Sequence, residues 1–139
     1  MGPARRVALL VEDDPALQEA MKRHLVTAQF DVLSASDYQA AVAHLPATPL
    51  DVVCIDLGLP NESGYELCER IRQEVALRFV PIVVTSEHTS PEAMARAEEA
   101  GANAFLKKPF SMRLLTECVE MLLSGGPESR PPIRRLRWA

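Results

Sequence analysis

Short apolar runs and stretches with helical period alternate along this chain. Five runs rich in β-branched and aliphatic residues are nearly continuous, which is typical of strands covered on both faces: residues 6–11, 31–35, 51–56, 80–85 and 104–106. Elsewhere apolar residues recur every three or four positions, which predicts helices over residues 15–28, 37–45, 64–74, 91–100 and 111–123. Boundary residues agree, because Ser63 and Glu66 form a capping box and Gly101 suits a C-terminal cap.

Strands that alternate with helices predict an α/β fold. The expected architecture is a doubly wound, five-stranded parallel sheet with helices on both faces, a flavodoxin-like three-layer (βα)5 arrangement. Right-handed crossovers favour the strand order 2-1-3-4-5. Such a sheet binds its ligand at the carboxyl ends of the strands, between the first and the third. Residues that follow the strands are therefore the candidates for function.

Composition adds limits to this picture. The chain has 139 residues, of which 47% are hydrophobic and 24% charged, as in an ordinary globular domain. No apolar stretch approaches the roughly 20 residues that a membrane span needs. The apolar run near the N-terminus is also too short for a signal peptide. We therefore expect a cytoplasmic protein without a membrane span.

The formal net charge of -4 is unevenly distributed. Residues 1–124 hold 11 basic and 18 acidic groups, a charge of -7, whereas residues 125–139 hold four arginines and one glutamate, a charge of +3. We divide the chain accordingly into a domain, residues 1–124, and a basic C-terminal tail or linker, residues 125–139. The acidic domain argues against direct DNA binding by residues 1–124.

Cysteines and histidines form no recognisable redox or metal-binding motif. Cys54, Cys68 and Cys118 lack CxxC spacing and lie in apolar runs, so we expect them in the core. The three histidines are too widely spaced for a metal-ligand pattern. His24 shares a predicted helix face with apolar residues, which favours a partly buried structural histidine over a phosphotransfer histidine.

Polar residues stand at the ends of four predicted strands. Glu12 and Asp13 follow the first strand, Asp56 ends the third, Thr85 ends the fourth and Lys108 follows the fifth. Carboxylates brought together repel each other, and Mg²⁺ is the cation that prefers such oxygen ligands. A phosphoryl group also fits, because the metal, the hydroxyl and the ammonium could hold its oxygens. Aspartate is a recognised nucleophile in phosphoryl transfer.

Each of these residues alone has an ordinary structural explanation. An acidic residue in a loop usually stabilises a helix N-terminus, and a lone lysine is usually a solvated surface charge. Their joint occurrence at the strand ends favours a functional site. Asp56 is the clearest case, since it closes the very apolar run 52–55, where an unpaired carboxylate would be costly.

These residues resemble the receiver domain of two-component response regulators, of the single-domain chemotaxis type. The resemblance covers about residues 5–124. Its most specific element is Asp56-Leu57-Gly58-Leu59-Pro60, which is similar to the phosphoacceptor segment of the family. Three further segments are similar to the acidic pocket, the fourth strand and the fifth-strand signature: Val11-Glu12-Asp13-Asp14, Pro81-Ile82-Val83-Val84-Thr85, and Gly101-Ala102-Asn103-Ala104-Phe105-Leu106-Lys107-Lys108-Pro109-Phe110.

The resemblance implies a role for each residue. Asp56 would accept a phosphoryl group from the phosphohistidine of a sensor histidine kinase or phosphotransfer protein. Thr85 and Phe105 would be switch residues, and Lys108, joined to Pro109 by a cis peptide bond, would contact the phosphoryl group. Mg²⁺ would be bound by three carboxylates and one backbone carbonyl: Glu12, Asp13, Asp56 and Gly58.

The resemblance also implies how the protein would pass its signal to a partner. The fourth helix, fifth strand and fifth helix would form a surface for a downstream protein partner, which the sequence does not identify. Unless the sequence is part of a longer protein, we expect output by protein–protein contact. The protein would be a signalling receiver and not an enzyme, although it would catalyse its own phosphoryl transfer and dephosphorylation.

Two residues depart from the usual pattern. Phe105 stands where the family more often has tyrosine, so the phenolic hydrogen bond is missing. Gly58 leaves no side chain over the phosphoryl site, and Glu87 could orient an attacking water. We therefore expect a phosphoryl-aspartate that is not unusually long-lived.

Other classes of protein fit less well. The main alternative is a binding module that keeps the fold and works without phosphorylation. An aspartate-dependent phosphatase would need an Asp-x-Asp pair, which Asp56-Leu57-Gly58 lacks. A flavin-binding domain would need a phosphate loop where the acidic Glu12-Asp13-Asp14 stands.

Residues 130–139 read Arg-Pro-Pro-Ile-Arg-Arg-Leu-Arg-Trp-Ala and lie outside the resemblance. Their composition is that of a disordered linker or of a docking peptide, since arginine and tryptophan are favoured interface residues. A docking peptide here could contact the acidic domain itself or a partner.

Overall fold

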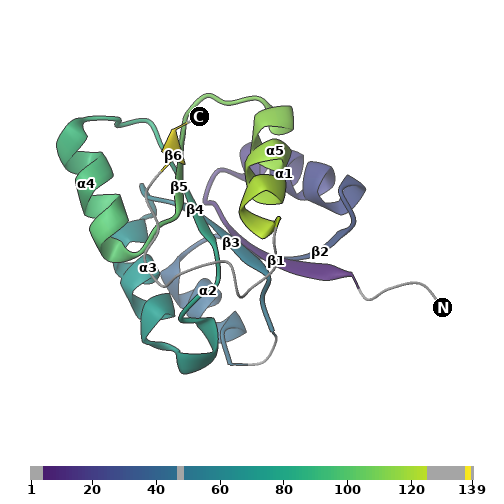
Figure 1. The fold of residues 1–139 in the computed structure, drawn as a ribbon, viewed down its shortest axis with the longest axis horizontal. Helices are drawn as coiled ribbons and strands as arrows, with labels where there is room; N and C mark the ends of the chain where they lie inside the picture. The colour runs from purple at the N-terminus through teal and green to yellow at the C-terminus, as the bar shows by residue number, and fades with distance from the viewer. Residues whose placement is uncertain (1–4, 47–48, 125–136, 139) are drawn as a thin grey trace.

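The computed structural model describes residues 5–46, 49–124 and 137–138. Strands and helices alternate along the chain (Figure 1). The strands are β1 (Arg6–Val11), β2 (Phe30–Ala35), β3 (Val52–Asp56), β4 (Ile82–Ser86), β5 (Ala104–Lys107) and the two-residue β6 (Arg137–Trp138). The helices are α1 (Pro15–Thr27), α2 (Tyr38–His44), α3 (Gly64–Gln73), the 3-10 turn η1 (Val75–Leu77), α4 (Pro91–Ala100) and α5 (Met112–Leu123).

The strands form one parallel sheet in the order β2-β1-β3-β4-β5-β6. The first five confirm the predicted α/β class and the order 2-1-3-4-5. The sixth strand was not predicted and comes from the C-terminal tail. The N-terminal limit predicted for the fourth strand was wrong, because Val80 closes the η1 turn through its N–H bond to the Leu77 carbonyl.

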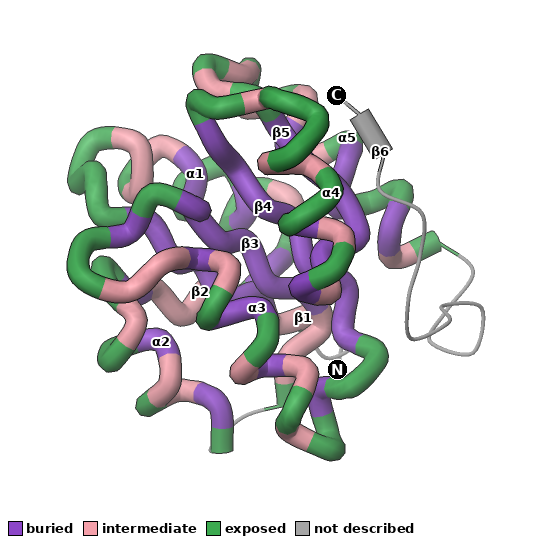
Figure 2. Tube along the Cα trace, turned by 90° about the vertical axis from the view of Figure 1, so that its left-hand side faces the viewer, coloured by how far each residue is buried: buried purple, intermediate pink, exposed green. Residues whose placement is uncertain are grey.

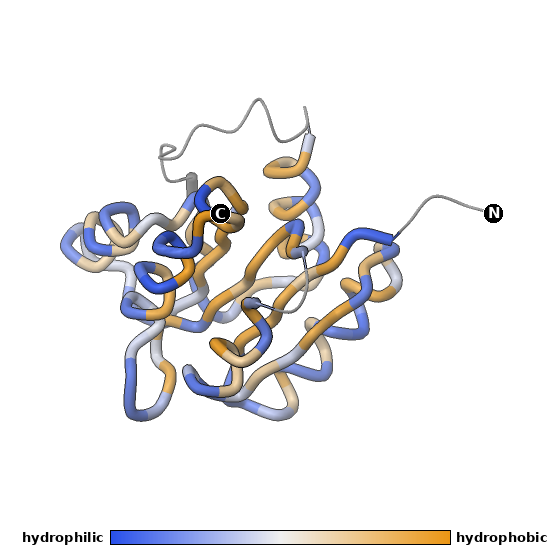
Figure 3. The backbone as a smooth tube through the Cα atoms, turned by 90° about the horizontal axis from the view of Figure 1, so that it is seen from below, coloured by the Kyte–Doolittle hydropathy of each residue, from blue (hydrophilic) through white to orange (hydrophobic). Residues whose placement is uncertain are grey.

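Helices cover both faces of the sheet. One face packs against α1 and α5 through a cluster that includes Met21, Leu25 and Leu115. The other packs against α2, α3 and α4 through a cluster that includes Leu67 and Ile71. The central strands β3 and β4 are buried throughout, whereas β2 at the edge of the sheet is only partly buried (Figures 2 and 3). The near-continuous apolar runs in the sequence thus correspond to strands with two buried faces.

Helix ends are fixed by local hydrogen bonds, and the residues that form them can be recognised in the sequence. The Asp14 carboxylate accepts the backbone N–H of Ala16 at the start of α1. Serines cap α3, α4 and α5 in the same way, at Ser63, Ser90 and Ser111. At the end of α4, Gly101 has φ 110°, which a residue with a Cβ rarely adopts. Because β1 to β5 are parallel, the loops that lead from these strands into helices lie at one edge of the sheet.

A half-buried arginine on α3 ties two loops to the domain. The Arg72 guanidinium donates to the carbonyl oxygens of Gly101 and Val80, each at 2.6 Å in its shortest bond. It also donates to the Asn103 side-chain oxygen at 2.9 Å, and that oxygen accepts the Ile82 N–H at 2.8 Å. Arg72 could not be identified from the sequence, because most of its partners are backbone carbonyls, which no motif reveals.

All three cysteines are free and buried, as expected. Cys54 belongs to the cluster under α1 and α5, together with Cys118, whereas Cys68 belongs to the opposite cluster. Burial raises the pKa of Cys54 and of Cys68 to about 12, so both remain neutral thiols. The expectation for His24 was wrong: it is exposed, because the buried stripe of α1 is centred on Met21 and Leu25.

Within the described ranges, none of the helices combines the length and the apolar character that crossing a membrane requires.

Candidate functional site

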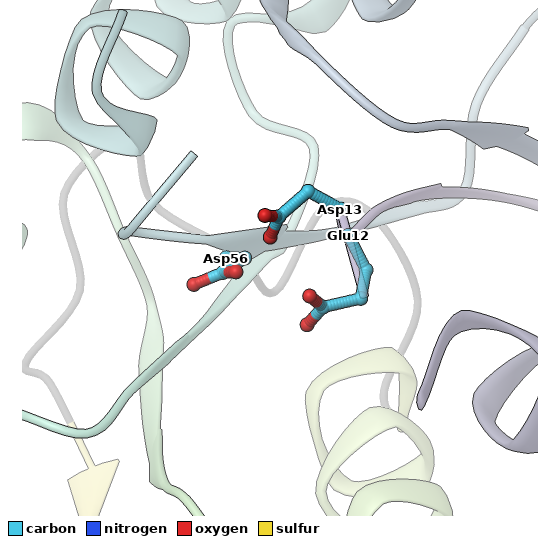
Figure 4. Close-up of side chains that lie close together, drawn as sticks. All are labelled: Glu12, Asp13 and Asp56. Atoms are coloured by element: carbon cyan, nitrogen blue, oxygen red, sulfur yellow. The ribbon is translucent and has the colours of Figure 1, made fainter. Parts of the chain in front are cut away.

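Three carboxylates meet at the carboxyl edge of the sheet. Glu12 and Asp13 directly follow β1, and Asp56 is the last residue of β3. One oxygen from each lies within 4.8 Å of the other two, and Figure 4 shows the side chains gathered at the strand ends. Glu12 and Asp56 are 1% and 5% exposed, whereas Asp13 is exposed to solvent. The predicted convergence of these residues is therefore observed.

Lys108 bridges two of these carboxylates from the end of β5. Its ammonium nitrogen lies 3.0 Å from Glu12 Oε1 and 3.2 Å from Asp56 Oδ2. The other Asp56 oxygen, Oδ1, accepts the Gly58 N–H at 2.9 Å. The peptide bond from Lys108 to Pro109 is cis. One cation thus compensates part of the charge of a crowded acidic cluster.

The surroundings shift the pKa values of Glu12 and Asp56 in opposite directions. For Glu12, burial and the neighbouring Asp56 charge raise the pKa from 4.5 to about 7, although the Asp14 N–H and Lys108 oppose this. For Asp56, burial raises the pKa, but the Gly58 N–H and Lys108 outweigh this effect and lower the pKa below its ordinary 3.8. Burial lowers the pKa of Lys108, but Glu12 and Asp56 reverse this and raise it. Asp56 is therefore ionised at neutral pH and available as a nucleophile.

The Thr85 hydroxyl is buried beside this cluster. Thr85 lies opposite Asp56 in the β3–β4 register, and the backbone N–H of Leu57 bonds to its carbonyl at 2.9 Å. Its Oγ1 has no hydrogen-bond partner within the described part of the chain. A buried hydroxyl without a partner costs free energy, so it points to a ligand oxygen that would complete it. A phosphoryl oxygen on Asp56 has the required chemistry.

A cleft of about 440 Å³ opens above the carboxylates. Its walls include Gly58, Glu87 and two residues that the sequence analysis did not single out, Tyr65 and His88. The Tyr65 hydroxyl donates to the Ala93 carbonyl of α4 at 3.3 Å. The Arg96 guanidinium lies 4.0 Å from the centre of the Tyr65 ring. The wall of the cleft is thereby linked to α4. The sequence offered one indication of this role, an aromatic residue early in α3.

Two residues named from the resemblance have distinct environments. A Cβ built at Gly58 would lie 3.5 Å from Asp56 Oδ1, an ordinary contact, so a side chain fits there. Phe105 is fully buried in β5 and belongs to the cluster under α2, α3 and α4. Space for a side chain is therefore left beside Asp56, and Phe105 packs in the layer of α2, α3 and α4.

The carboxylate cluster fits a hard divalent cation. Its donors are oxygens only, from Glu12, Asp13 and Asp56, and Mg²⁺ is bound by such carboxylates together with waters and phosphate oxygens. The exposed Asp13 and the open cleft leave room for those waters. Burial, together with the neighbouring Asp56 charge, raises the pKa of Glu12, and a bound cation would favour the ionised carboxylate again.

Comparison with known proteins defines the class. The family model described as "Response regulator receiver domain" matches residues 8–120, so the chain belongs to the receiver domains of response regulators. The transcriptional regulatory protein GltR of Pseudomonas aeruginosa is 33% identical over 121 residues, 85% of this chain and 49% of that protein. The sensory transduction protein BceR of Halalkalibacterium halodurans is 30% identical over 115 residues, 83% of this chain and 48% of that protein. The chain thus spans about half the length of these two relatives.

Solved structures of receiver proteins share the fold over nearly their whole length. The chemotaxis response regulator CheY4 of Vibrio cholerae has a TM-score of 0.82 and 27% identity, with 86% of this chain and 100% of that chain covered. A putative response regulator from Chloroflexus aurantiacus has a TM-score of 0.81 and 30% identity, with 87% and 99% covered. The five-stranded domain with its acidic pocket is therefore a two-component receiver domain.

Proposed function

We propose that this protein is a phosphorylation-controlled signalling switch whose phosphoacceptor is Asp56. The observation that supports this most directly is the grouping of an ionised, buried aspartate with two further carboxylates and a lysine at one sheet edge. Membership of the receiver family implies a histidine kinase as the phosphodonor. A phosphotransfer protein carrying phosphohistidine offers the same chemistry.

The reaction follows from the positions of these groups. An Asp56 carboxylate oxygen attacks phosphorus, the P–N bond to the donor histidine breaks, and its electron pair returns to the imidazole nitrogen. Lys108 stabilises one phosphoryl oxygen, and the Thr85 hydroxyl donates to another. Glu12, Asp13, Asp56 and the Gly58 backbone carbonyl would hold Mg²⁺, which supplies charge neutralisation on the phosphoryl oxygens.

Release of the signal requires hydrolysis. A water adds to phosphorus, the P–O bond to Asp56 breaks, and inorganic phosphate leaves with the carboxylate restored. The protein is therefore not an enzyme with a separate substrate but catalyses its own phosphorylation and dephosphorylation. Phosphorylation would draw Thr85 toward the phosphoryl group and Phe105 inward, altering the α4-β5-α5 surface that a downstream protein partner reads.

We place this switch in the cytoplasm, with residues 1–124 as the receiver domain and residues 125–139 as a basic tail or linker. The acidic charge of residues 1–124 supports protein partners and not direct DNA binding by this part.

Incubation with acetyl phosphate and Mg²⁺ tests the proposal. Intact-mass spectrometry should show the addition of one phosphoryl group to the wild type and none to Asp56→Asn. The matched control is Asp37→Asn, which makes the same change at the exposed N-cap of α2, where asparagine also caps. This control should be phosphorylated like the wild type.

Absence of phosphorylation in the wild type, with acetyl phosphate or with phosphohistidine donors, would favour the alternative function. In that case the protein is a receiver-fold binding module that works without phosphorylation. An unchanged mass gain in Asp56→Asn would instead show that another residue accepts the phosphoryl group.

A further inference from the structure

The last described residues of the chain form a strand at the edge of the receiver sheet. Arg137 pairs with Ala104 and Trp138 with Phe105, parallel to β5. Figure 1 shows β6 beside β5, with α4 on one side and α5 on the other. The tail thus occupies the outer edge of the strand that lies at the centre of the proposed output surface.

The edge of β5 is chemically suited to strand addition. Its first three residues, Ala104, Phe105 and Leu106, are apolar, and Lys107 at the end is its only charged residue. An exposed edge strand presents unpaired N–H and C=O groups, and a short apolar one without proline is a template for another chain. At the opposite edge, β2 carries the charged Asp31, and the Arg5 guanidinium donates to the Phe30 backbone carbonyl at 2.9 Å.

The hand of the connection sets β6 apart from the five other strands. The connection through α1 steps from β1 toward the β2 edge, whereas the connection through α5 steps from β5 toward the opposite edge. Both helices lie on the same face of the sheet, so the two connections have opposite hands. Connections through α2, α3 and α4 step toward the β5 edge on the other face and share the hand of the first.

The disfavoured hand indicates that β6 is an addition to a completed domain. Parallel connections in one sheet share one hand in about 98% of cases, because a helix packed over the sheet favours it. A strand that joins with the other hand is held by its own backbone pairing and not by a helix packed to fit it. It therefore resembles a bound peptide more than a sixth element of the fold.

Charge also favours this site for the tail. Residues 125–139 have a charge of +3, and α4, which flanks β5, holds three glutamates and one arginine: Glu92, Glu98, Glu99 and Arg96. Attraction of a basic segment to an acidic neighbourhood raises its local concentration there. A tether of 13 residues between Leu123 and Arg137 can span at most about 45 Å, ample for one small domain.

We infer that the outer edge of β5 is a docking site for an extended peptide strand and that this chain's own Arg137–Trp138 occupies it in cis. The tail is then an internal competitor, and a protein partner that adds a strand to β5 has to displace it. This inference rests on backbone pairing and needs no phosphoryl group, so it is tested without Mg²⁺ or phosphodonor, independently of the proposed function.

Amide hydrogen exchange of the full chain provides the test. Arg137→Pro removes one N–H from β6 and restricts its backbone, which opposes pairing. Arg130→Pro is the matched control, with the same residue change and charge outside β6. At least one amide of Ala104–Lys107 should exchange about threefold to tenfold faster in Arg137→Pro than in the wild type, as expected for the loss of one net hydrogen bond. Arg130→Pro should exchange like the wild type.

Trp138 gives a second readout, because it is the only tryptophan of the chain. Its fluorescence anisotropy should be lower in Arg137→Pro than in the wild type and in Arg130→Pro. Equal exchange and equal anisotropy in all three proteins would overturn the docking site, as would equal effects of both prolines. Protection that increases with protein concentration, together with a dimer in sedimentation, would overturn occupancy in cis and assign the edge to the tail of a second copy.

Discussion

Glu12 and Asp56 are neighbouring carboxyl groups whose pKa values the site shifts in opposite directions. Asp56 accepts a backbone N–H and faces Lys108, whereas Glu12 is almost fully buried and adjoins the charge of Asp56. Asp56 is thus kept ionised, while Glu12 retains its proton up to about pH 7 in the metal-free protein. Burial of Glu12, together with the Asp56 charge, makes its ionisation costly to the folded state, and Mg²⁺ would relieve this cost.

This cost predicts a pH dependence of the metal-free protein. Unfolded Glu12 ionises near 4.5, but the folded protein retains the proton to about pH 7. Between these values the unfolded chain binds fewer protons, so the free energy of unfolding falls as pH rises, by about 3 kcal/mol at most. The lowered pKa of Asp56 has the opposite effect on the free energy of unfolding. The stability that Asp56 contributes is lost only as the pH falls below the ordinary pKa of 3.8.

Urea unfolding in EDTA between about pH 5 and about pH 7.5 measures this slope. Glu12→Gln should remove the Glu12 contribution, whereas the exposed Glu117→Gln should keep the wild-type profile. If Glu12→Gln shows the same fall in stability as the wild type, the raised pKa is not its source.

Gly58 leaves open space beside Asp56, the proposed phosphoacceptor. No side chain shields Asp56 at this position, a side chain fits beside its Oδ1, and Glu87 lines the same cleft. We predict that Gly58→Asn lengthens the lifetime of the phosphoryl-aspartate several-fold, because the amide would exclude the attacking water. Phosphate release after removal of the donor measures this lifetime. Gly58→Ala, which adds only a Cβ, is the control, and an unchanged lifetime in Gly58→Asn would contradict the prediction.

The polar site residues could be predicted from the sequence because parallel strands end at one edge. Asp56 ends β3, Thr85 is the last residue but one of β4, and the fold alone brings them together. Tyr65 and Arg72 could not be predicted, since Tyr65 acts through a ring contact with another helix and Arg72 through backbone carbonyls. Such partners depend on how helices pack, which local patterns do not encode.

At the scale of elements, the start of α3 is packed directly onto the end of β3. A Cβ at Gly64 would lie 2.4 Å from the Asp56 carbonyl oxygen and 2.7 Å from Leu57 Cα, so the helix would have to move. We predict that Gly64→Ala lowers the free energy of unfolding by about 1–3 kcal/mol. Gly58→Ala, only six positions away but in ordinary contact distance, should change it by less than about 1 kcal/mol.

Urea denaturation of both alanine variants measures the two values. Phosphorylation by acetyl phosphate should also be slower in Gly64→Ala, because the clash of the added Cβ disturbs the end of β3, where Asp56 lies. Equal stabilities of the two variants would show that the backbone at Gly64 adapts without cost.

Element boundaries were predictable where a cap residue marks them. Helix α4 begins and ends as predicted because Ser90-Pro91 and Gly101 fix its ends. The strand predicted from residue 80 begins instead at Ile82. The apolar run in the sequence starts earlier, because it includes the partly exposed Phe79 and Val80, which is the last residue of a turn. The pairing of β6 was unpredictable, since a two-residue strand has no periodicity and depends entirely on its partner.

For the whole molecule, cation binding and folding are linked. Any ligand that binds only the folded state stabilises it, by about 2.7 kcal/mol at a hundred times the dissociation constant. We therefore predict that Mg²⁺ raises the thermal unfolding midpoint of the wild type. Asp13→Asn should remove this effect, because Asp13 belongs to the carboxylate cluster.

The neighbouring Asp14→Asn is the matched control, since Asp14 caps α1 and asparagine preserves that cap. NaCl at equal ionic strength separates specific binding from screening. An equal Mg²⁺ effect in Asp13→Asn and Asp14→Asn would place the cation elsewhere.

The three buried cysteines have a consequence for how the motions of the domain can be followed. A thiol reagent needs both access and a thiolate, so each cysteine reacts only when its surroundings open. Cys68 lies in the layer of α3 and α4, while Cys54 and Cys118 lie in the layer of α1 and α5. Their labelling rates would therefore report the opening of the two halves separately, and a comparison with and without a phosphodonor would show which half responds, with no probe added to the chain.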